Sequence, residues 1–155
     1  MLEEIFPLGT KLKGLWWESR DGRIRLPEHL SEEKYRDSSK HGEPGITFGR
    51  QIGAYPILVG VPYAIPLESG SDIIVTGHGM RSISGIEYGL DINHATKSQL
   101  QALPGIGDKA SWKIISNRAR RANKNQGAFA SVEEAFSEAG VTMPPLAPEV
   151  FVTTH

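Results

Sequence analysis

Two glycines and two lysines near residue 107 have the types and spacing that hold a phosphate group. Gly105 and Gly107 flank Ile106, and Lys109 and Lys113 follow at an interval of four residues. If a helix begins after the second glycine, its first amides are free and its dipole is positive there, which makes an anion site. The two lysines then lie on one helical face beside the anion. Ile106 is expected to pack back between the helices and to fix the turn.

Positive charge continues beyond this turn. Residues 108–124 contain one acid, Asp108, and six basic residues: Lys109, Lys113, Arg118, Arg120, Arg121 and Lys124. A Walker-type phosphate loop is excluded because no Lys-Ser or Lys-Thr pair follows the glycines at the required spacing. The alternative interpretation is an ordinary helical hairpin with a solvated basic face.

The residues around the turn predict helices. Residues 96–99 have the capping-box pattern Thr-x-x-Gln, which predicts the start of a helix. The turn Pro-Gly-Ile-Gly at 104–107 is expected to end that helix. Asp108 is expected to cap the next helix. A third helix is expected over 131–139. The proline-rich segment 141–155 is expected to be an irregular tail, so the helical domain is predicted over 90–140.

The chain before residue 90 is rich in glycine and proline and predicts short strands. Asp21-Gly22 is a favoured hairpin turn. Residues 27–44 are polar and are expected to form an excursion between strands. Strand candidates are residues 12–18, 23–26, 46–50, 54–60, 73–76 and 83–88. Five or six short strands at close spacing favour a small closed antiparallel barrel or a sandwich over residues 5–89.

Composition excludes several classes of site. The 155 residues have a net charge of −1, so any nucleic-acid surface must be local. There is no cysteine, which excludes thiolate zinc sites and cysteine-held iron–sulfur clusters on this chain. The five histidines have no metal-binding spacing, and neither a metal nor a cofactor is expected. No apolar run is long enough to span a membrane, and the first residues lack a signal-peptide pattern, so a cytoplasmic location is expected.

Three segments of the second half resemble the helix-hairpin-helix domain of the competence DNA receptor family. They are residues 90–93, 99–107 and 129–134. The resemblance covers about 50 residues and implies contact with a DNA or RNA backbone. Ser111 stands where that family usually has alanine. A second hairpin at 140–145 lacks a Gly-x-Gly turn, which implies one phosphate-binding side.

Residues 48–62 and 77–82, taken with the hairpin, resemble the C-terminal region of an archaeal family of radical S-adenosylmethionine enzymes. The resemblance implies an OB/TRAM-like barrel that binds nucleic acid, with a catalytic radical S-adenosylmethionine domain as a partner. The barrel residues expected to contact a nucleic-acid strand are Arg50, Tyr55 and Arg81. The alternative is that Tyr55 packs in the core and that both arginines pair with nearby acids.

The predicted fold class is α+β, a small antiparallel OB/TRAM-like β-barrel followed by an all-α helix-hairpin-helix domain. The predicted function is a nucleic-acid-binding accessory module that contacts the backbone without reading sequence and is not itself an enzyme. The runner-up is a protein-interaction or structural module that packs against a catalytic domain. A stand-alone hydrolase is a weaker third interpretation, because no metal or nucleophile cluster can be identified in the sequence.

Overall fold

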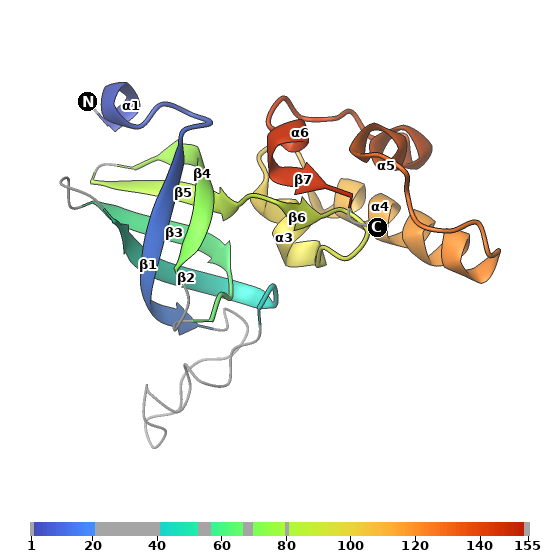
Figure 1. Ribbon diagram of the computed structural model, residues 1–155, viewed down its shortest axis with the longest axis horizontal. Coiled ribbons are helices and arrows are strands. Elements are labelled where there is room, and N and C mark those ends of the chain that lie inside the picture. Colours follow the sequence, from blue (N-terminus) through green and yellow to red (C-terminus); the bar gives the residue numbers. More distant parts are fainter. Residues whose placement is uncertain (1, 21–40, 53–56, 67–69, 80, 154–155) are drawn as a thin grey trace, which may run out of the picture. The chain divides into compact units, whose positions relative to one another are not determined.

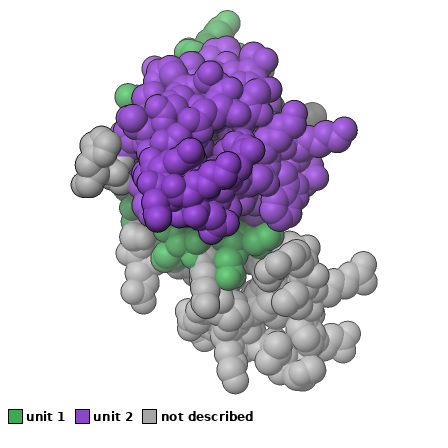
Figure 2. All heavy atoms as spheres, turned by 90° about the vertical axis from the view of Figure 1, so that its right-hand side faces the viewer, with its two compact units in different colours: residues 1–87 green, residues 88–155 purple. Residues whose placement is uncertain are grey.

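The computed structural model describes residues 2–20, 41–52, 57–66, 70–79 and 81–153. The chain divides into two compact units, Met1–Glu87 and Tyr88–His155 (Figure 2). The first unit has 10 basic and 12 acidic residues and a net charge of −2, whereas the second has 7 and 6 and a net charge of +1. The excess of positive charge therefore belongs to the second unit.

Five strands of the first unit close into a barrel (Figure 1). They follow a short helix, α1 (Leu2–Ile5), and are β1 (Lys11–Arg20), β2 (Pro44–Gln51), β3 (Leu58–Tyr63), β4 (Ser71–His78) and β5 (Ser82–Glu87). Around the barrel their order is β1-β2-β3-β5-β4, and β4 pairs with β1 to close it. The small barrel is confirmed.

One pair of strands differs from the expected antiparallel arrangement. β3 and β5 run parallel, with Leu58 beside Ser82 and Gly60 beside Ser84. The reason is the connection: β5 forms an antiparallel hairpin with β4 before it lies against β3. The strand expected at 54–60 also lies later, because its buried residues alternate through Val59, Val61 and Tyr63. The expected strand at 23–26 and the excursion up to residue 40 lie outside the described residues.

The barrel interior is filled mainly by apolar side chains of β1, β3, β4 and β5, whereas β2 contributes Thr47 and Gly49. Trp16 of β1 is 6% exposed, and its indole N–H donates to Ser71 Oγ at 3.1 Å. A Cβ atom on Gly14 would lie 2.5 Å from the Trp16 ring, and one on Gly49 would lie 2.2 Å from the carbonyl oxygen of Leu15. These two glycines therefore make the room in which the large ring packs.

The second unit is helical, with one short pair of strands (Figure 1). Its elements are β6 (Leu90–Asp91), α3 (Lys97–Ala102), α4 (Asp108–Asn123), α5 (Val132–Ala139), α6 (Ala147–Val150) and β7 (Phe151–Val152). The expectation of an irregular tail over 141–155 is wrong, because β7 pairs in parallel with β6. Val150 and Phe151 are fully buried there, and the Phe151 ring lies 6.5 Å from that of Phe136.

The helix ends follow the local signals in the sequence. Thr96 Oγ1 accepts from the Gln99 amide while the Gln99 side chain accepts from the Thr96 amide, so the predicted capping box is confirmed. Ser131 caps α5, and Gly140 ends it in the left-handed conformation with φ of 68°. These caps fix the residues at which α3 and α5 begin.

Candidate nucleic-acid interface

The turn between α3 and α4 is held by one buried side chain and one glycine. Ile106 is 4% exposed, and its amide donates to the carbonyl of Leu103 at 3.1 Å, so it packs inward as expected. Gly105 has a φ of 102°, which other residues rarely adopt. A Cβ atom on Gly105 would also lie 3.1 Å from Pro144 Cγ. The turn therefore presents its backbone in one fixed geometry.

Gly107 keeps the start of α4 open. It is the N-cap of α4, with a φ of −94° and no side chain to accept from the helix. A Cβ atom placed on it would meet nothing within 4 Å. Among the described residues, no acceptor is found for the amides of Asp108, Lys109 or Ala110. Three amide donors at the positive end of a 16-residue helix thus have no acceptor among the described residues, and Gly107 places no side chain beside them.

Asp108 does not cap α4 as expected; it is the first residue of the helix. Its carboxylate turns toward α3, where it accepts from Lys97 Nζ at 2.5 Å and from Gln101 Nε2 at 3.4 Å. The hydrogen bond from Lys97 lowers the pKa of Asp108 below its ordinary value. Because the Lys97 charge offsets that of the carboxylate, the free amides remain available to an external anion.

The exposed face of α4 is basic along its length. Five exposed residues of α4 each lie three or four residues along the helix from another member of the group: Lys109, Trp112, Lys113, Ser116 and Arg120. They therefore share one side of the helix, which we call the basic face of α4. Its lysines flank the free amides, as the sequence predicts. This arrangement suits a run of phosphates, in which one group is held at the amides and others lie beside the helix.

Arg118 lies elsewhere and has a structural role that the sequence does not reveal. Its Nη1 atom donates to the carbonyls of Ile92 and Ala95 at 3.1 and 2.7 Å. Burial lowers the pKa of this guanidinium, partly offset by the charge of Asp91. Arg118 therefore fastens the loop before α3 to α4, and it does not lie on the basic face of α4.

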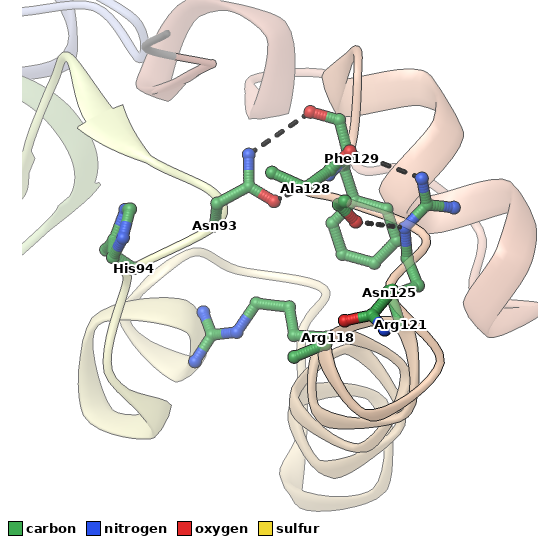
Figure 3. Close-up of a pocket in the computed structure, with 9 residues that line it drawn as sticks. Asn93, His94, Arg118, Arg121, Asn125, Ala128 and Phe129 are labelled. Atoms are coloured by element: carbon green, nitrogen blue, oxygen red, sulfur yellow. Dashed lines mark hydrogen bonds between the residues drawn. The ribbon is translucent and has the colours of Figure 1, made fainter.

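Arg118 and Arg121 line a hollow of about 440 Å³ (Figure 3). The Arg118 guanidinium points to the side where His94 lies, whereas Arg121 points to the side of Phe129. Arg121 donates to the carbonyls of Gly127 and Ala128 and to the carboxylate of Glu138. These contacts hold the loop before α5 against α4.

The barrel residues expected to contact nucleic acid are placed in part. Arg50 of β2 is exposed and pairs with Leu58 of β3, which in turn lies beside Ser82 of β5. Arg81 precedes Ser82 and is also exposed. The register therefore brings Arg50 and Ser82, the neighbour of Arg81, to one row roughly 10 Å apart across two strand spacings. Tyr55 lies outside the described residues.

Sequence reasoning missed Trp112 and Lys97. Trp112 is 52% exposed on the basic face of α4, and Lys97 Nζ lies 4.8 Å from its ring centroid. The sequence does carry a signal, because Trp112 lies three residues after Lys109, at the spacing of residues on one helical face. A tryptophan is normally assigned to a core, and the spacing shows here that it faces outward.

Two kinds of feature are absent from the part of the chain that the structure describes. There, no three His, Asp or Glu side chains come together in a group able to hold a metal ion. Within the same ranges, no helix has the length and apolar character needed to cross a membrane.

Comparison with known proteins locates a motif and a relative. Residues 86–135 match the family model described as the helix-hairpin-helix motif. An uncharacterized protein of Archaeoglobus fulgidus is 41% identical over 63 residues, which are 41% of this chain. The matched region is 12% of the length of that relative, so the relative is a much longer protein. No solved structure matches the chain. The second unit of this chain thus contains a helix-hairpin-helix motif.

Proposed function

We propose that this chain is a nucleic-acid-binding accessory module that grips the phosphate backbone without reading its sequence. The observation that carries the proposal is the open end of α4. Three amides have no protein acceptor among the described residues, Gly107 leaves open space at the start of the helix, and Lys109 and Lys113 follow, all within a matched helix-hairpin-helix motif. Backbone amides and lysines recognise phosphate oxygens, which are the same for every sequence.

The test is fluorescence anisotropy with two unrelated duplexes and one single strand at two salt concentrations. One hairpin contacts about two to four phosphates, so the slope of log K against log salt is expected near −2 to −4 for duplex. Affinity is expected in the range typical of non-specific binding, about 10⁻⁴ to 10⁻⁶ M at physiological salt. Both duplexes should bind alike, and a tenfold preference for one of them contradicts sequence-independent contact.

The double variant Lys109→Glu, Lys113→Glu locates the contact. Both side chains are exposed, so the variant is expected to fold and to lose binding. The matched control is Lys124→Glu, compared with Lys113→Glu alone. Lys124 follows the far end of α4, roughly 16 Å along the helix from Lys113. A charge effect spread over the whole molecule would weaken both single variants equally, whereas contact at the hairpin weakens Lys113→Glu more.

For the first unit we infer a barrel of the OB type. A five-stranded closed barrel is the form of that fold, and its second and third strands carry the ligand face. Arg50 and Leu58 lie side by side on β2 and β3, and Ser82, which follows Arg81, lies in the same row. Arg50→Glu is therefore expected to weaken oligonucleotide binding, and unchanged binding contradicts a ligand face there.

We further propose that the module serves a radical S-adenosylmethionine enzyme that modifies nucleic acid. The support is the resemblance of residues 48–62 and 77–82 to the C-terminal region of that archaeal family, and the greater length of the archaeal relative. Because this chain has no cysteine, the cluster belongs to another domain or chain. A Cys-x3-Cys-x2-Cys triplet encoded beside or in frame with this sequence is the expected finding, and its absence contradicts this parentage.

A second candidate function is protein docking by the barrel. Leu15 and Leu58, which flank Arg50 across the strands, are 43% and 39% exposed, and Ile52 is 48% exposed. Apolar side chains gathered on an outer surface are typical of a protein contact. Leu58→Asp distinguishes the two assignments: unchanged oligonucleotide binding assigns this row to a protein partner, and weakened binding assigns it to nucleic acid.

A further inference from the structure

Trp112 is an exposed aromatic ring in a unit whose phenylalanines are all in the core. It is 52% exposed, whereas Phe129, Phe136 and Phe151 are each 1% exposed. Leaving an indole in water forgoes the burial that stabilises such a side chain in a core. About half of the Trp112 side chain is therefore open to a ligand.

Its position relates it to the phosphate site. Trp112 lies five residues after Gly107, about 7.5 Å along the helix, which is the scale of one nucleotide. It stands between Lys109 and Lys113 on the basic face of α4. Suppose that a nucleic-acid strand has one phosphate held at the amides and its neighbouring phosphates beside the lysines. Such a strand brings a sugar and base to this ring.

The ring is also held in place by α3. Lys97 Nζ lies 4.8 Å from the Trp112 ring centroid and 2.5 Å from Asp108 Oδ1. The ammonium thus binds the ring through a cation–π contact while the carboxylate fixes the ammonium. A ring held in this way loses little side-chain freedom when a planar ligand stacks on it.

We propose that Trp112 stacks an unpaired base beside the phosphate held at the start of α4, so that the second unit prefers single-stranded nucleic acid to duplex. In a duplex the bases are stacked on each other, and only an unpaired base presents a face to a ring on a protein surface. Every base has such a face, so stacking adds affinity and no sequence preference. This inference rests on the proposed backbone contact.

The test compares three ligands of equal length: a single strand, the same strand made entirely abasic, and the duplex. Trp112→Ala is expected to bind the single strand about five- to 150-fold more weakly, the loss typical of one stacked base. Binding of the abasic strand and the duplex is expected to change by less than about twofold, because the phosphate contacts remain. Trp112→Phe is expected to retain most of the single-strand affinity, and the salt slope should not change since no charge is removed.

Two further variants separate this inference from the proposed function. Ser137→Ala, at an exposed position of α5 outside the basic face of α4, is the control and should bind all three ligands as the parent does. Lys109→Glu, Lys113→Glu should lose all three, including the abasic strand. If the lysines matter but Trp112→Ala binds the single strand normally, or weakens all ligands equally, the stacking inference is wrong and the backbone contact stands. If the parent chain binds none of the ligands, the proposed function itself is wrong.

Discussion

Gly105 and Gly107 flank one isoleucine, yet their backbones make different demands. Gly105 has a φ of 102° and lies against Pro144, so a side chain is strained there. Gly107 has an ordinary φ of −94° and open space around it. Gly107 therefore has no need of a positive φ, and it serves by leaving the first amides of α4 uncovered.

Gly105→Ala is expected to lower the free energy of unfolding of the second unit by about 1–3 kcal/mol, the typical cost of a side chain at such a backbone position. Urea denaturation followed by the helical circular dichroism signal measures the change, because the long helices belong to this unit. A variant as stable as the parent would show that the turn relaxes freely.

Gly107→Ser is expected to separate stability from binding. A serine at the N-cap accepts from an amide of the first turn, which stabilises a helix by roughly a few tenths of a kcal/mol relative to glycine. The same hydroxyl occupies a donor that the phosphate needs, so nucleic-acid binding is expected to weaken. Denaturation and anisotropy on the same sample test both effects, and a serine variant that binds as tightly as the parent argues against the amides as donors.

At the scale of elements, α6 and β7 close the second unit. Phe151 of β7 is buried against Phe136 of α5, and Val150 of α6 is fully buried. The carbonyl of Val150 accepts from Gly89, and that of Val152 accepts from Ile92. The end of the chain thus binds the segment 89–92, with which the helical unit begins.

Phe151→Ala is therefore expected to lower the free energy of unfolding by about 3–5 kcal/mol, as large-to-small changes in a core do. The neighbouring Val152 is 37% exposed and supplies the control. Val152→Ala should cost less than about 1 kcal/mol, because much of its side chain is already in water. Equal losses from the two variants, measured in urea, would contradict the packing described for β7.

In the barrel, His41 pairs with Glu87 at the end of β5. His41 Nε2 lies 2.6 Å from Glu87 Oε1, and this hydrogen bond raises the pKa of His41 above its ordinary value. The pair therefore stabilises the folded barrel fully below the ordinary pKa of histidine, and the contribution is lost as the pH rises through the raised value. Because the His41 side chain is partly exposed, water screens the pair and keeps its contribution to stability small.

His41→Gln is expected to destabilise the barrel more at about pH 6 than at about pH 9, where the parent has also lost the charge. Urea unfolding at the two pH values, followed by tryptophan fluorescence, measures the difference because Trp16 is buried in the barrel. An equal effect at both pH values would show that the charge of His41 does not contribute.

At the scale of the whole molecule, local signals are predictable from the sequence and distant partners are not. The capping box of Thr96 and Gln99 and the inward packing of Ile106 depend on residues a few positions away. The role of Arg118 is not predictable, because its acceptors lie 23 and 26 residues away along the chain. The pairing of β7 with β6 likewise joins the two ends of the second unit and has no local signature.

The whole chain is expected to bind no iron–sulfur cluster, since it has no cysteine to hold one. Anaerobic reconstitution with iron and sulfide, followed by visible absorption and iron analysis, tests this. Stoichiometric cluster iron would contradict the expectation and would require a set of ligands other than thiolates.

The two units are joined by very little chain. β5 ends at Glu87 and β6 begins at Leu90, so only Tyr88 and Gly89 connect the strands, and the Gly89 amide is already bonded to Val150. If both units contact one strand, as proposed, binding by the first raises the effective concentration of the second to the millimolar range of short linkers. Two contacts that are each weaker than the affinity expected for the whole chain then add up through avidity. Loss of either contact is expected to release the strand far more readily than the affinity of that contact alone implies.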